Sequence, residues 1–95
     1  MAEAVRIIDV RLVPAPASLA HTGLLGFVSC SVNGVALDGI AVRRSRSGEV
    51  ALTFPERRDA AGRHHRYFRL LDAGARADLE AQVLTELRRQ GRIAQ

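Results

Sequence analysis

Lysine and tryptophan are absent from this sequence of 95 residues, and cysteine occurs only once, as Cys30. A single thiol cannot form a disulfide within one chain, which is typical of a reducing compartment. No apolar run reaches the roughly 18 residues of a membrane-spanning helix, and the Met-Ala-Glu-Ala start lacks the basic head and apolar stretch of a signal peptide. We therefore expect a cytoplasmic protein that does not contact a membrane.

Aromatic residues are also scarce, since the chain has one tyrosine and three phenylalanines. Few rings are therefore present on which unpaired bases could stack. The length suits a single domain over residues 1–95, and a domain of this size buries only somewhat more than about 60% of the surface that its unfolded form exposes. Because its own core must be thin, we expect a homodimer, in which a second copy adds apolar burial.

Positive charge is concentrated in one part of the chain. All 14 basic residues are arginines, against ten carboxylates. The segment 43–69 contains eight of these arginines and three carboxylates, so it carries a net charge of +5 while the rest of the chain sums to −1. A basic stripe on an otherwise neutral molecule is typical of a surface that binds a polyanion, because released counterions drive association with phosphates. A solvated hairpin kept soluble by its charge is the alternative.

Alternating apolar residues predict five strands, at about 5–13, 24–32, 35–43, 50–54 and 66–71. In the first of them, one face should carry Ile8, Val10 and Leu12. Between the second and third, Asn33-Gly34 predicts a tight hairpin turn, because both residues readily adopt positive φ. Consecutive strands joined by short turns indicate an antiparallel meander.

Three further features complete the predicted fold. Gly39 indicates a bulge or a close backbone approach within the third strand. The segment 56–65 is expected to be a polar loop with Gly62 near its tip. Asp72 is a suitable N-cap for a helix over about 73–90, in which apolar residues recur every four positions. The order of strands and then one helix predicts an α+β domain with one face of the sheet covered.

Five segments resemble, in the same order and with nearly the same spacing, those of the SpoVG family, the bacterial stage V sporulation proteins linked to septation. Ile8-Asp-Val-Arg-Leu12 is similar to the family's opening strand, and Val35–Val42 and Gly48–Pro55 resemble two later strands. Pro55-Glu-Arg-Arg-Asp-Ala-Ala-Gly62 aligns without a gap on the family's signature Pro-Ser-Lys-Arg-x-Pro-Asp-Gly. The segment 75–87 resembles its terminal helix. The likeness covers residues 7–87, although Ala60-Ala61 replaces the family's Pro-Asp.

The resemblance implies a DNA- or RNA-binding regulator of septation, sporulation or gene expression, usually a homodimer joined through its sheets. It implies no enzymatic activity, and we expect no cofactor and no small-molecule substrate. The alternative is a non-enzymatic protein-interaction module of the division or regulatory machinery, whose arginines meet an acidic partner.

The candidate nucleic-acid-binding residues fall in two groups. The first flanks the predicted loop and consists of Arg57, Arg58, Arg63 and Arg66, of which the first two take the place of the family's basic pair. Guanidinium groups pair well with phosphate and can reach guanine edges. With so few aromatic residues, contacts to the backbone of a duplex or a structured RNA are favoured over a stacking platform for single strands.

The second group lies at another hairpin end and consists of Arg43, Arg44 and Arg46. The sequence leaves open whether it shares a side with the first group or lies at the opposite end of the sheet. Late in the chain, Arg88, Arg89 and Arg92 are open to two interpretations. They could widen the basic surface, or they could have a structural role alone, because cations are favoured at a helix C-terminus.

Other candidates are weaker. His64-His65 has no third ligand at metal-binding spacing, so a contribution to the basic patch is favoured over a metal site. Cys30 lies in the middle of a strand on the apolar face, which argues against a nucleophile. Asp9 and Asp38 lie within strands, and pairing with arginines such as Arg11 or Arg43 is expected.

Overall fold

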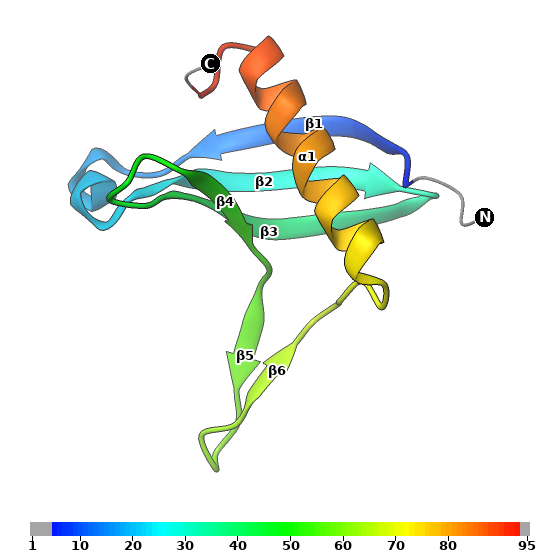
Figure 1. Cartoon of the computed structure of the whole chain (residues 1–95). Helices are drawn as coiled ribbons and strands as arrows, with labels where there is room; N and C mark the ends of the chain where they lie inside the picture. The colour runs from blue at the N-terminus through cyan, green and yellow to red at the C-terminus, as the bar shows by residue number, and fades with distance from the viewer. Residues whose placement is uncertain (1–4, 94–95) are drawn as a thin grey trace.

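The computed structural model describes residues 5–93. A sheet of four strands lies beneath one helix, and a separate two-stranded hairpin projects away from both (Figure 1). The elements in chain order are β1 (Ile7–Pro14), the 3-10 helix η1 (Ala17–Thr22), β2 (Leu24–Val32), β3 (Val35–Arg44), β4 (Val50–Thr53), β5 (Glu56–Arg58), β6 (His64–Arg66) and α1 (Ala73–Arg89). The predicted α+β class, with an antiparallel sheet and a C-terminal helix, is confirmed.

The large sheet is an antiparallel meander in the order β1-β2-β3-β4. Asn33 and Gly34 connect β2 to β3 with φ values of 50° and 81°, so the predicted tight turn is confirmed. The predicted bulge at Gly39 is also present, because the pairing of β2 with β3 shifts between Val28 and Cys30 and Gly39 has a φ of 74°. Glycine adopts this conformation without a steric penalty.

The predicted faces of β1 are wrong at one position. Asp9 has a φ of 55°, and the pairing of β1 with β2 shifts between Ile8 and Arg11. The extra residue of this bulge reverses the alternation, since consecutive strand side chains point to opposite faces. Val10 and Leu12 therefore pack against the core, whereas Ile8 is 54% exposed.

Helix α1 covers one face of the large sheet and buries its apolar stripe there (Figure 1). Leu79, Val83 and Leu87 are fully buried, as are Ile40 and Val42 on the sheet. The predicted cap is confirmed, because a carboxylate oxygen of Asp72 accepts a hydrogen bond from the backbone nitrogen of Ala75 at 2.9 Å. No helix in residues 5–93 is long and apolar enough to cross a membrane.

Polar side chains of α1 bind the backbone of both edge strands. Gln82 Oε1 accepts a hydrogen bond from the backbone nitrogen of Ile7 in β1 at 3.2 Å. On the opposite edge, Glu80 Oε2 accepts from the backbone nitrogen of Leu52 in β4 at 3.1 Å. These contacts satisfy donors that an edge strand leaves unpaired, and they hold the helix across the sheet.

The prediction of a fifth strand over 66–71 is wrong. That segment is a strand only at Arg66, and the segment 67–71 is irregular. Residues 56–65, expected as a loop, instead contribute β5 and most of β6, which pair with each other and not with the large sheet. A strand exists only where it has a partner, and the chain after Arg66 turns away toward the start of α1, where Phe68 and Leu70 pack against the core.

Candidate nucleic-acid interface

Residues 59–63 connect β5 to β6, and their conformation is set by Asp59. Asp59 Oδ1 accepts hydrogen bonds from the backbone nitrogens of Ala61 and Arg63, each at 2.9 Å. The backbone nitrogen of Gly62 donates to the Asp59 carbonyl at 3.0 Å, and Gly62 has a φ of 83°. A turn followed by a glycine in the left-handed region commonly connects the two strands of a hairpin. Hydrogen bonds among residues 59–63 therefore fix the conformation of the tip.

The hairpin presents arginine on both of its faces. Arg57 pairs with His65, and Arg58 pairs with His64. Because neighbouring strand residues point to opposite sides, Arg57 and Arg58 lie on different faces. Every residue of β5 and β6 is exposed, as is Arg63. The structure thus brings the first candidate group together on one projecting element (Figure 1).

Two histidines alternate with these arginines, and each contacts a carboxylate. On one face, His64 Nδ1 lies 2.6 Å from Glu56 Oε1 and His64 Nε2 lies 3.3 Å from Arg58 Nη2. On the other face, His65 Nε2 lies 2.7 Å from Asp59 Oδ2. The hydrogen bond from His65, followed by those from backbone nitrogens in the turn, lowers the pKa of Asp59. Both carboxylates of the hairpin are therefore engaged by imidazoles.

The base of the hairpin is fixed by aromatic contacts. The rings of Phe54 and Phe68 lie 5.4 Å apart between centroids, at an angle of 44°. The guanidinium carbon of Arg76, on α1, lies 5.0 Å from the centroid of Phe54, a cation–π contact. Tyr67 is 66% exposed, whereas Phe68 packs against the core. The chain segments that enter and leave the hairpin are thus attached to the sheet and to the helix.

The second candidate group lies elsewhere. Arg43 and Arg44 end β3, and Arg46 lies in the turn to β4, at the end of the sheet beside η1 (Figure 1). Arg44 and Arg46 line a cleft there together with His21. The question that the sequence left open is answered, because this cluster is separate from the projecting hairpin.

Three of the weaker candidates, Cys30, Asp9 and Asp38, lie in the large sheet and outside the hairpin. Cys30 is buried, and burial, followed by the charge of Asp38, raises the pKa of its thiol. A buried thiol of raised pKa is a poor nucleophile. Within residues 5–93, no three His, Cys, Asp or Glu side chains gather as a metal site. In the same segment neither Asp9 nor Asp38 forms an ion pair, so the expected pairing with arginines is wrong.

The positions of His64 and His65 were not predicted. Both were expected in a loop, but the structure places one on each face of the hairpin, opposite Arg58 and Arg57. A usable signal was present in Asp59-Ala-Ala-Gly62, since aspartate at the first position and glycine at the fourth favour a type I turn. The register of the hairpin follows once that turn is recognised.

The chain matches no model of a known protein family and no curated protein. The resemblance to the SpoVG family accordingly stays an expectation that rests on the five segments.

Proposed function

We propose that this protein binds nucleic acid through the β5–β6 hairpin and acts as a cytoplasmic, non-enzymatic regulator of the SpoVG type. The observation that carries the proposal is the gathering of Arg57, Arg58, Arg63 and Arg66 on one exposed, projecting hairpin. Guanidinium groups on a projecting element can reach phosphates without a conformational change elsewhere. The arginines outnumber the two carboxylates, and both carboxylates contact histidines.

A homodimer joined through the sheets is part of this proposal. Helix α1 covers one face of the four-stranded sheet. On the opposite face apolar side chains are exposed, among them Val13 at 65% and Phe27 at 42%. Val13 and Phe27 are paired neighbours on β1 and β2. A second copy that covered these side chains would place two basic hairpins in one assembly and increase affinity for a long polyanion.

The test is fluorescence anisotropy with labelled duplex DNA and structured RNA at two salt concentrations. Binding by the unmodified protein should weaken with salt, with a slope of log K against log salt of about −0.9 for each phosphate neutralised on duplex DNA. Arg57→Ala/Arg58→Ala should lose most binding and reduce the magnitude of the slope by up to about 2. Light scattering must first show that the variants share one oligomeric state.

A matched control removes the same charge from the other cluster. Arg43→Ala/Arg46→Ala deletes two exposed arginines at the η1 end of the sheet and should weaken binding less than the hairpin variant. Equal losses for both variants would show a diffuse electrostatic effect and contradict a site on the hairpin. If no variant and no unmodified protein bound nucleic acid at low salt, the arginines would be assigned to an acidic protein partner instead.

A further inference from the structure

The hairpin is a free-standing ribbon, which limits the ligands that it fits. Within the described residues, β5 and β6 pair with each other and contact no other helix or strand. All six of their residues are exposed, so no side chain of the ribbon is used to bury a core. An element that projects in this way, with cations on both faces, is matched to a ligand that surrounds it and not to a flat surface.

The two faces and the tip carry different groups. One face presents Glu56, Arg58, His64 and Arg66, and the opposite face presents Arg57 and His65. The tip is Ala60-Ala-Gly62, which has no bulky side chain. Cations at the sides and small residues at the tip suit a groove whose walls carry phosphates and whose floor carries base edges.

The dimensions of the ribbon decide which groove can receive it. The major groove of B-form DNA is about 12 Å wide and about 8.5 Å deep, and it admits a two-stranded ribbon. Each strand of the hairpin has three residues, which at about 3.4 Å per residue span a length similar to the depth of this groove. The minor groove, at about 6 Å wide, is too narrow, and the major groove of A-form RNA is too narrow for side chains to read.

We propose that the β5–β6 hairpin enters the major groove of duplex DNA as a two-stranded ribbon, so that the preferred ligand is B-form DNA and not an RNA duplex. This inference rests on the proposed function. Arg57 and Arg58 then face opposite walls of the groove, and the alanines of the tip reach its floor, where an alanine methyl can contact a thymine methyl. The hydrogen bonds of Asp59 hold the tip in shape before binding, which reduces the entropic cost of association.

The first test compares labelled duplex DNA and duplex RNA of the same sequence, and then adds groove-binding competitors to the DNA complex. DNA should bind more tightly than RNA by about tenfold or more. Methyl green, which occupies the major groove, should displace the protein, and netropsin, which occupies the minor groove, should leave it bound. Equal affinity for the two duplexes, or displacement by netropsin alone, would overturn the inference while leaving nucleic-acid binding in place. An absence of binding to any nucleic acid would instead contradict the proposed function.

A second test blocks entry without changing charge. Ala61→Trp places a bulky ring at the exposed tip and should weaken DNA binding by about tenfold or more, because the ribbon can no longer reach the floor of the groove. Leu71→Trp is the control, since Leu71 is 88% exposed and lies outside the hairpin; this variant should bind like the unmodified protein. Unchanged binding by Ala61→Trp would overturn the inference. A change in the oligomeric state of this variant would also overturn it, because the tip would then be assigned to a contact between two copies of the chain.

Discussion

His64 Nε2 lies 3.3 Å from Nη2 of Arg58 across the hairpin. A guanidinium group only donates, so the imidazole accepts through Nε2 and carries its proton on Nδ1, from which it donates to Glu56. His64 thereby connects the guanidinium group of Arg58 to the carboxylate of Glu56 on one face of the candidate interface.

The contact between Phe54 and Phe68 should stabilise the fold as well as the base of the hairpin. Phe54 is 6% exposed, and its ring meets that of Phe68 at 5.4 Å. Because Phe68 is only half-buried, Phe68→Ala should lower the free energy of unfolding by about 2 kcal/mol, less than the loss at a fully buried phenylalanine. Urea denaturation measures the difference. Leu71→Ala, at a position that is 88% exposed, should change stability by less than about 0.5 kcal/mol, and equal effects would contradict the assignment.

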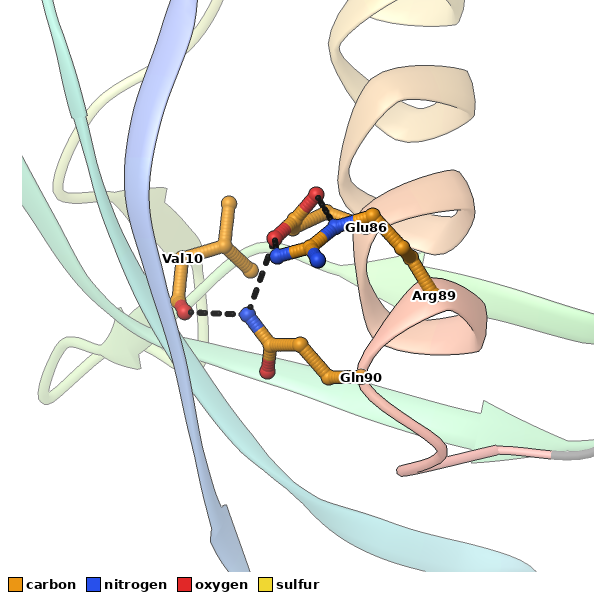
Figure 2. Close-up of polar contacts among 4 residues, drawn as sticks. All are labelled: Val10, Glu86, Arg89 and Gln90. Atoms are coloured by element: carbon orange, nitrogen blue, oxygen red, sulfur yellow. Dashed lines mark hydrogen bonds and ion pairs between the residues drawn. The ribbon is translucent and has the colours of Figure 1, made fainter.

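Glu86 links the end of α1 to the edge strand β1. Its carboxylate contacts Arg89 and Gln90, and Gln90 Nε2 donates to the backbone oxygen of Val10 at 3.1 Å (Figure 2). The hydrogen bond from Arg89, followed by that from Gln90, lowers the pKa of Glu86 from 4.5 to about 2. A carboxyl group whose pKa is lowered by folding stabilises the protein above its ordinary pKa, and that contribution is lost as the pH falls through the folded value.

Glu86→Gln should therefore lower the melting temperature at pH 7, and the difference from the unmodified protein should disappear as the pH approaches 2. Thermal unfolding followed by circular dichroism at a series of pH values measures this. Glu49→Gln, an exposed position in the β3–β4 turn, should have little effect at any of these pH values. A loss of stability from Glu86→Gln that was the same at pH 7 and pH 2 would contradict the role of its charge.

If the proposed dimer forms through the face of the sheet opposite α1, a charge placed on that face should disrupt it. Phe27→Asp places a charge at a position where an apolar ring is 42% exposed, so it should convert a dimer into monomers. Sedimentation velocity measures the change, and Ala77→Asp, on the exposed side of α1, should leave the dimer intact. A Phe27→Asp protein that sedimented as the unmodified protein does would place any association elsewhere.

Several elements of the fold were predicted from local sequence because their causes are local. Asn33-Gly34 forms the expected turn since both residues tolerate positive φ, and Asp72 begins the helix because its carboxylate accepts from a backbone nitrogen of the first turn. The apolar stripe that includes Leu79 and Val83 is buried as its spacing predicts. The cluster of arginines that forms the candidate interface was also visible as a concentration of charge.

Other features depended on contacts between distant residues. The bulge at Asp9 exposes Ile8, and no local pattern marks aspartate for a φ of 55° within a strand. The segment 66–71 alternates as a strand would. The pairing with β5 nevertheless ends at Arg66, and Phe68 contacts Phe54 instead. Alternation predicts which side chains could share a face, and it does not identify a pairing partner.

The sequence by itself determined the meander, the helix, its cap and the excess of arginine over residues 43–69, because each depends on residues close together in the chain. Only the tertiary structure decided that Arg57 and Arg58 occupy opposite faces of a separate projecting ribbon, while Arg43 and Arg46 lie at another end of the sheet. The physical reason is that strand pairing and the packing of Phe54 against Phe68 join residues that are distant in sequence, and these contacts direct the hairpin away from the sheet.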